Sequence, residues 1–158
     1  MSEFRPSEKI FGILEARVAV IAARWNGEIT DGLLRGAIKA LTRHGIAQKD
    51  IEIFRVPGAF ELPLASQRAA RTGRFSAILS LGCVIRGDTP HFDYVCSETT
   101  RGIGQVSLNE NLPVAFGLLT TDNLEQSLER SGDNSENKGE EAALTALEML
   151  TILQKMDG

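Results

Sequence analysis

The sequence contains few of the residues that usually bind metal ions. Among its 158 residues are only two histidines and two cysteines, and Cys83 and Cys96 lack the spacing of metal ligands. Both cysteines stand in or near apolar segments, so we expect two core or half-buried thiols. The sequence therefore predicts no metal site.

A basic patch, abundant aromatic residues and long apolar runs are also missing. The formal net charge is -4 and only 6% of the residues are aromatic, which leaves little attraction or stacking surface for nucleic acid. The apolar runs fall short of the roughly 20 residues that cross a bilayer, and the N-terminus has no apolar signal region. We therefore expect no nucleic acid or membrane partner, and a cytoplasmic location.

The remaining composition is that of an ordinary globular protein. With 42% hydrophobic and 24% charged residues, the sequence fits neither a disordered nor a collagen-like class. A chain of this length is near the usual size of one domain, and it buries roughly two thirds of its unfolded surface in one core. We expect a single α/β catalytic domain over residues 16–158, preceded by an N-terminal segment over residues 1–15.

Short apolar runs alternate with segments of helical periodicity. Strands are predicted at residues 16–23, 51–56, 77–85 and 113–120, and helices after the first strand, over residues 59–71, 92–109 and 123–130, and after residue 137. Nearly continuous apolar strands that alternate with helices form parallel sheets covered on both faces. The expected fold is a doubly wound, flavodoxin-like, four-stranded parallel sheet with helices on both faces, a three-layer sandwich.

Several residues mark where these helices begin and end. His44-Gly45 predicts the end of the first helix, because glycine adopts the left-handed conformation at low cost. Asp122 with Glu125, and Asn137 with Glu140, have the spacing of N-terminal capping pairs. We therefore expect helices to begin directly after residues 122 and 137.

The segment with the clearest chemistry runs over residues 86–91, Arg-Gly-Asp-Thr-Pro-His, between a strand and a helix. Ligands of such sheets bind outside the carboxyl ends of the strands. Gly87 allows close approach of the backbone, free N–H groups mark the helix start, and Thr89 adds a hydroxyl, which together suit a phosphate. Asp88 either caps the helix or opposes a bound anion, and a tight capped turn without a ligand is the alternative.

His91 is expected at the start of that helix, where the helix field disfavours the imidazolium form. A neutral imidazole can both accept and donate a proton, as a general acid and base must. The alternative is an exposed histidine in a turn.

Four further residues have a functional and a structural interpretation. Glu61 can accept hydrogen bonds from a polyol or simply favour a helix start. Trp25, the only tryptophan, can stack on a flat heterocycle or serve as a lid or core residue. Arg130 and Lys138 flank a polar turn, where they can pair with a phosphate or remain solvated.

Five segments spread over nearly the whole chain carry a further signal. They are Arg24-Trp25-Asn26, Val56-Pro57-Gly58-Ala59-Phe60-Glu61, Gly82-Cys83-Val84-Ile85-Arg86-Gly87-Asp88-Thr89-Pro90-His91-Phe92-Asp93-Tyr94-Val95, Phe116-Gly117-Leu118-Leu119-Thr120-Thr121 and Asn137-Lys138-Gly139. In this order and spacing they resemble the 6,7-dimethyl-8-ribityllumazine synthase family, which performs the penultimate step of riboflavin synthesis. The resemblance implies condensation of 5-amino-6-(D-ribitylamino)uracil with 3,4-dihydroxy-2-butanone 4-phosphate, releasing phosphate and water, without a cofactor or metal.

The resemblance also implies a role for each matching residue. His91 transfers protons. The residues that meet the pyrimidine and ribityl parts are Trp25, Asn26, Ala59, Phe60, Glu61, Cys83, Val84, Ile85, Phe116 and Lys138, and those that bind phosphate are Gly87, Asp88, Thr89 and Arg130. In the family, Phe116, Arg130 and Lys138 come from a neighbouring subunit.

An assembly of identical subunits follows from the same resemblance. It implies a pentamer, which in some members closes into a shell of 60 subunits, and residues 1–15 are then expected to pair with a neighbouring subunit. Riboflavin synthase is a further partner that the resemblance allows.

Two other classes remain open, a carrier that sequesters a flavin or lumazine without turnover and a capsid-like shell with vestigial activity. A flavodoxin-like electron carrier or a receiver domain is disfavoured. The first strand–helix turn lacks both a hydroxyl-rich phosphate loop and paired acids.

Overall fold

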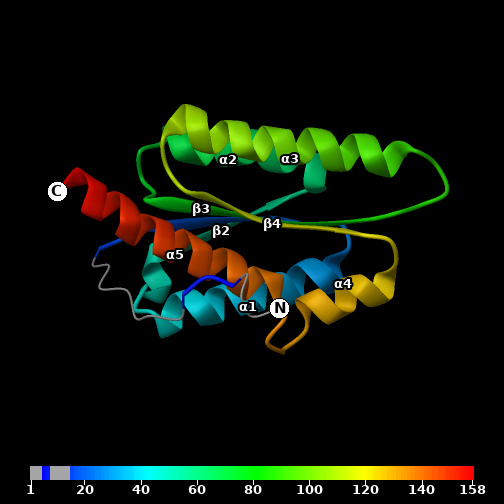
Figure 1. Ribbon diagram of the computed structural model, residues 1–158, viewed down its shortest axis with the longest axis horizontal. Helices are drawn as coiled ribbons and strands as arrows, with labels where there is room; N and C mark the ends of the chain where they lie inside the picture. Colours follow the sequence, from blue (N-terminus) through cyan, green and yellow to red (C-terminus); the bar gives the residue numbers. More distant parts are fainter. Residues whose placement is uncertain (1–4, 8–14) are drawn as a thin grey trace.

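A four-stranded parallel sheet forms the centre of the computed structural model, which describes residues 5–7 and 15–158 (Figure 1). Its strands are β1 (Val18–Ala23), β2 (Ile51–Val56), β3 (Ala77–Ile85) and β4 (Val114–Thr121), in the order β2-β1-β3-β4. Every neighbouring pair is parallel. The predicted doubly wound fold is confirmed.

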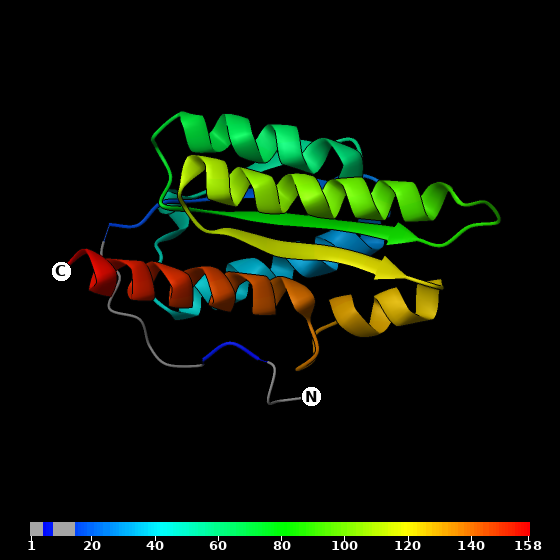
Figure 2. The same cartoon turned by 45° about the horizontal axis from the view of Figure 1, so that its top comes forward.

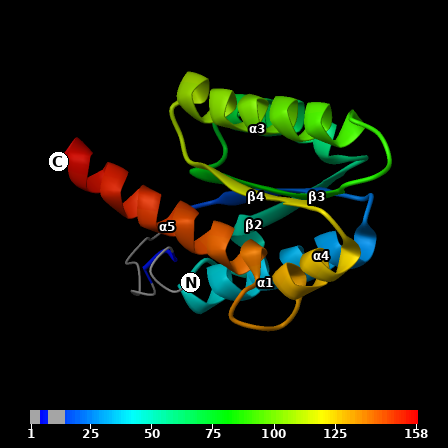
Figure 3. The ribbon, with the colours of Figure 1, turned by 45° about the vertical axis from the view of Figure 1, so that its right-hand side comes forward.

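The helices cover the two faces of this sheet (Figures 1 and 3). The α1 (Gly27–Arg43), α4 (Leu124–Ser131) and α5 (Lys138–Asp157) helices lie on one face, and α2 (Leu62–Arg71) and α3 (His91–Glu110) on the other. Two single-turn 3-10 helices, η2 (Gln48–Asp50) and η3 (Ala59–Glu61), precede β2 and α2. Each face has its own apolar core, with Leu33, Leu79 and Leu147 in one and Ile21, Leu62 and Ile103 in the other.

The direction of winding reverses between β1 and β3, and this places a crevice at their carboxyl ends. From β1 the chain passes through α1 to β2 on one side, whereas from β3 it passes through α3 to β4 on the other. Right-handed crossovers in opposite directions put the connecting helices on opposite faces. Figure 2 shows β3 and β4 pointing to the same end of the molecule, where α3 begins and α4 lies. Such a switch point is where doubly wound sheets bind ligands.

The first helix illustrates how the sequence pattern sets the layers. Its buried residues Ile29, Leu33, Ala37 and Leu41 recur every four positions and face the sheet. The helix ends at Arg43, and Gly45 follows in the left-handed region with φ 97°. The predicted end of the helix is therefore confirmed.

One of the two predicted capping residues is correct. Asn137 precedes α5, and its side-chain oxygen accepts a hydrogen bond from the Glu140 N–H at 3.0 Å. Asp122 does not cap α4, because Asn123 occupies the cap position and accepts from the Gln126 N–H at 2.9 Å. That prediction was therefore wrong by one residue.

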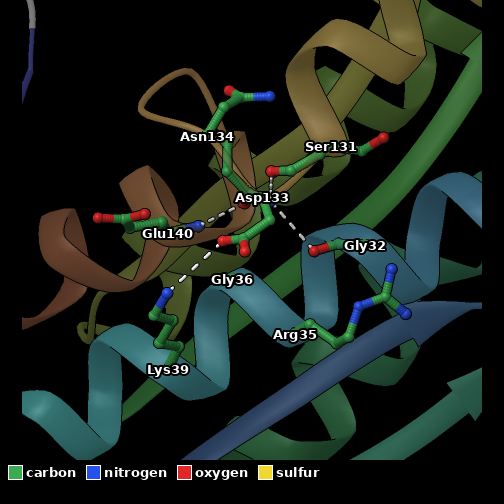
Figure 4. A pocket seen from close by; sticks show the side chains of 10 residues that line it. Gly32, Arg35, Gly36, Lys39, Ser131, Asp133, Asn134 and Glu140 are labelled. Atoms are coloured by element: carbon green, nitrogen blue, oxygen red, sulfur yellow. Dashed lines mark hydrogen bonds and ion pairs between the residues drawn. The ribbon is translucent and has the colours of Figure 1, made fainter.

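A pocket of about 220 Å³ separates α1 from the turn between α4 and α5 (Figure 4). Lys39 and Asp133 face each other across it, with 3.5 Å between their charged atoms. Next to the pocket, α1 and the α4–α5 turn are joined by the Asn137 side chain. Its amide donates to the carbonyl oxygens of Gly32, at 3.1 Å, and Gly132, at 2.9 Å. A side chain at residue 32 would collide with the Ser131 carbonyl, because an added Cβ would lie 2.2 Å from that oxygen.

Residues 5–7 of the N-terminal segment lie against α5. Arg5 forms an ion pair with Glu140 at 3.9 Å, and the Ser7 N–H donates to the Glu148 carboxylate at 2.8 Å. The segment's other residues up to residue 14, for which pairing with a neighbouring subunit is expected, lie outside the described residues. Among the helices that are described, none has the length and apolarity needed to span a membrane.

The close approach at Gly32 can be tested against a second helical glycine. We expect Gly32→Ala to lower the free energy of unfolding by about 1–3 kcal/mol, because the methyl group meets a fixed carbonyl. Gly104 in α3 has open space around its Cβ position, so Gly104→Ala should raise stability by about 0.5–1 kcal/mol through helix propensity. Urea unfolding of the two variants measures the difference, and equal effects would contradict the predicted clash.

Candidate active site

A groove of about 890 Å³ lies at the switch point of the sheet. Its walls are residues that follow β1 and β2, the last three residues of β3, and one face of α3. The lining residues are Trp25, Asn26, Ala59, Phe60, Cys83, Val84, Ile85, His91, Tyr94, Val95, Ser97 and Glu98. Eight of these were predicted from the sequence, so the fold brings most of the predicted residues together.

Asn26 joins the ends of β1 and β3 at the floor of the groove. Its side-chain N–H donates to the Cys83 carbonyl oxygen at 2.9 Å. The residue has φ 58° and ψ 49°, in the left-handed region that asparagine tolerates better than most residues. This conformation turns the chain from β1 into α1, so the local backbone and the contact to β3 depend on the same side chain.

Trp25 is held in place by the end of β2. Its backbone N–H donates to the Pro57 carbonyl at 3.0 Å, and its ring passes so close to Gly58 that an added Cβ would lie 2.3 Å from the indole. The side chain is still 62% exposed. An aromatic surface of this size, fixed from behind and open in front, can stack on a flat ring.

The three groove residues of β3 point to alternate faces of the sheet. Cys83 and Ile85 pack with the α1, α4 and α5 layer, and Val84 with the α2 and α3 layer. The Cys83 sulfur lies 3.3 Å from the Ser127 hydroxyl oxygen in α4, so Cys83 offers the groove its main chain more than its thiol. Burial raises the pKa of the Cys83 thiol and outweighs its side-chain hydrogen bonds to Ser127 and Thr121.

His91 is the first residue of α3, as predicted, and its side chain is exposed. The same helix face adds Tyr94, Val95 and Glu98 to the groove, at three, four and seven residues from the histidine. These residues, and Ser97, were missed as site residues. The helical spacing from His91 was the signal that could have identified the first three.

The residues of the predicted phosphate loop are not among those that line the groove. Gly87, Asp88 and Thr89 are all exposed, and the Thr89 hydroxyl accepts a hydrogen bond from the His91 N–H at 3.4 Å. Pro90, two residues after Asp88, directly precedes α3. The possibility that Asp88 caps the helix is therefore wrong, and its carboxylate is left on the loop.

Glu61 stabilises the turn behind Trp25. Its carboxylate accepts a hydrogen bond from the Gly58 N–H at 3.0 Å, and its side chain is half-buried. The residues described as lining the groove do not include Glu61, although its neighbours Ala59 and Phe60 are among them.

Phe116, Arg130 and Lys138 line a second pocket, of about 290 Å³, along β4 and the start of α5. Arg130 donates to the Gln126 carbonyl at 2.9 Å, and Lys138 pairs with Glu141 at 2.7 Å. Within one chain the structure therefore does not bring these three residues to the groove that contains His91.

Within residues 5–7 and 15–158, no group of three or more histidine, cysteine, aspartate or glutamate side chains could hold a metal ion. The polar side chains that line the groove, among them Asn26, His91 and Ser97, can donate and accept hydrogen bonds.

Fold and groove define a class, the doubly wound α/β proteins that bind a small molecule at the switch point of a parallel sheet. A family model described as 6,7-dimethyl-8-ribityllumazine synthase matches residues 15–154, and the chain belongs to this family. Membership implies an enzyme of the lumazine synthase type in riboflavin biosynthesis.

A solved structure, a GDP-L-fucose synthetase from Naegleria fowleri, is similar over 96% of this chain, with 10% sequence identity and a TM-score of 0.42. This chain covers 47% of that structure, about half of its length.

The burial of Cys83 gives a prediction. We expect Cys83 to resist a thiol reagent at pH 8 in the folded protein, because it is buried and its raised pKa keeps it protonated. In a Cys96→Ser variant, which leaves Cys83 as the only thiol, colour from Ellman's reagent should develop only after urea is added. An equally fast reaction without urea would contradict the described burial of Cys83.

Proposed function

We propose that the protein condenses 5-amino-6-(D-ribitylamino)uracil with 3,4-dihydroxy-2-butanone 4-phosphate to 6,7-dimethyl-8-ribityllumazine, the penultimate step of riboflavin synthesis. The observation that carries this proposal is the groove itself, which has an open indole, Trp25, and an imidazole, His91, among its walls. This condensation needs both a surface on which a flat heterocycle can stack and a group that transfers protons.

The pyrimidine lies against Trp25 in this proposal, with Val84, Ala59 and Phe60 as its apolar surroundings. The main chain at Cys83 and Ile85 offers hydrogen bonds to the edge of the ring. The ribityl hydroxyls reach towards Asn26 and Glu61, whose carboxylate has acceptor positions left beyond the one used by Gly58.

The phosphorylated ketone is held by the exposed loop over residues 87–89. Backbone N–H groups at the start of a 20-residue helix favour an anion there. Asp88 adds a negative charge, so its carboxylate has to point away from the phosphate. Arg130 supplies the balancing cation from a neighbouring chain.

The reaction is a series of proton transfers that one imidazole can serve. The amine of the uracil attacks the ketone, and loss of water gives an imine. Phosphate then leaves, and ring closure releases a further water. His91 takes and returns protons in these steps. The groove holds amine and ketone together, and this proximity lowers the reaction barrier by several kcal/mol, roughly ten at most.

A second copy of the chain completes the site in this proposal. Phe116, Arg130 and Lys138 line a pocket separate from the groove, so they can serve a groove only across a subunit interface. We propose a pentamer of single catalytic domains over residues 16–158, in the cytoplasm, with residues 1–15 contacting a neighbour. A shell of 60 subunits and an association with riboflavin synthase are further extensions of this proposal.

A variant of His91 tests the proposed chemistry. We expect His91→Ala to reduce the rate of lumazine formation by about 10²–10⁴-fold, because general acid–base catalysis is lost while the groove remains. The absorbance of the product during incubation with both substrates gives the rate.

Two controls separate chemistry from folding and binding. Light scattering should show the same assembly size for His91→Ala and wild type, and quenching of the single tryptophan should still report binding of the uracil. A wild-type rate in the variant would refute the role of His91. A wild-type protein that binds the uracil without forming product would be a carrier instead.

A further inference from the structure

Arg86 is the last residue before the 87–90 loop, and its guanidinium contacts the residue that follows β4 and the first turn of α3. Its Nε donates to the Asp122 carboxylate at 2.9 Å, just after β4, and Nη1 lies 3.4 Å from the Asp93 carboxylate in the first turn of α3. Its central carbon lies 4.4 Å from the centre of the Phe92 ring. One side chain therefore joins the end of β4 to the start of α3.

The backbone reinforces this connection. The Arg86 N–H donates to the Thr121 carbonyl at 2.9 Å, which continues the pairing of β3 with β4 to the start of the loop. At the other end, Phe92 is buried with only 8% exposed, so the ring under the guanidinium is fixed. The loop leaves the sheet at Arg86 and enters α3 at His91, and the same guanidinium restrains both ends.

We propose that Arg86 is a positioning residue, which sets the shape of the 87–90 loop and the place of His91 without touching the substrate. A planar guanidinium that stacks on a ring and bonds to two carboxylates has a defined orientation, which a single exposed ion pair lacks. The inference rests on the proposed function, in which this loop binds the phosphate group.

A direct role in phosphate binding is the competing interpretation, since Arg86 is a cation beside the loop. Two carboxylates, those of Asp93 and Asp122, already oppose its charge and hold it against Phe92. A phosphate would have to displace them. The geometry therefore favours a latch, meaning a side chain that connects the end of β4 to the start of α3, over a residue that binds the phosphate directly.

The two interpretations predict opposite effects of removing Asp122. For a latch, Arg86→Ala and Asp122→Ala each raise the KM for the phosphorylated ketone by about ten-fold, within the roughly 10²-fold that a small misplacement can cost. The double variant is then no worse than Arg86→Ala alone, because the Asp122 carboxylate acts on the loop only through Arg86. For a direct ligand, Asp122→Ala frees the arginine and lowers this KM, which would overturn the proposal.

The KM for the uracil should stay near its wild-type value in all three variants, because the Trp25 side of the groove is unchanged. Arg71→Ala is the matched control, since Arg71 forms an ion pair of the same length, 2.9 Å, with Glu110 at the far end of α3. It should leave both KM values unchanged.

Hydrogen exchange keeps the test independent of the proposed activity. Arg86→Ala should speed amide exchange in a peptide that contains residues 87–91, and Arg71→Ala should not. If wild type forms no product, the proposed function fails while this measurement still reports the latch. Unchanged exchange in Arg86→Ala would overturn the latch even in an active enzyme.

Discussion

The hydrogen bond from the Asn26 side chain to the Cys83 carbonyl is the contact on which the site depends. It joins the two strands between which the winding of the sheet reverses, at the place where the crevice opens. The left-handed backbone at Asn26 sends the chain into α1, and the preceding Trp25 is thereby directed over Gly58. Loss of this contact would separate the floor of the groove from its aromatic wall.

Both main-chain groups and side chains form the surface of the groove. Cys83 and Ile85 direct their side chains into the opposite core and present main-chain groups, whereas Trp25 and His91 present rings. The sheet thus supplies shape, and one helix face supplies the imidazole that is proposed to move protons. Arg130, the cation proposed for the phosphate, lies in another pocket, so an incomplete site in one chain is consistent with the proposed assembly.

Most of the fold could be predicted because the short apolar runs of the sequence coincide with the buried strands of the sheet. The strands over residues 51–56 and 77–85 match the prediction, while the first starts at Val18, where pairing with both neighbouring strands begins. The fourth starts one residue later than predicted, because Pro113 has no N–H for the ladder. The cap at Asn123 was missed, since adjacent Asp122 is an equally good capping residue and only the backbone angles decide between them.

The candidate site was less predictable from sequence than the strands. Residues at strand ends, such as Trp25 and Val84, could be placed because parallel strands end at one edge of a sheet. Ser97 was missed because it looks like an ordinary exposed helix residue, and only the packing of α3 over the crevice brings it in. The turn-stabilising role of Glu61 was hidden for a related reason, since it depends on the Gly58 N–H that the 57–58 turn exposes.

Activity regained by mixing two inactive variants tests the two-chain site most directly. His91→Ala and Arg130→Ala chains are unfolded in urea, combined in equal amounts and refolded together. If His91 of one chain works with Arg130 of another, about one quarter of the wild-type sites are restored, because each site needs one intact residue from each chain. A mixture as inactive as its two parents, with assemblies of normal size, would contradict a site shared between chains.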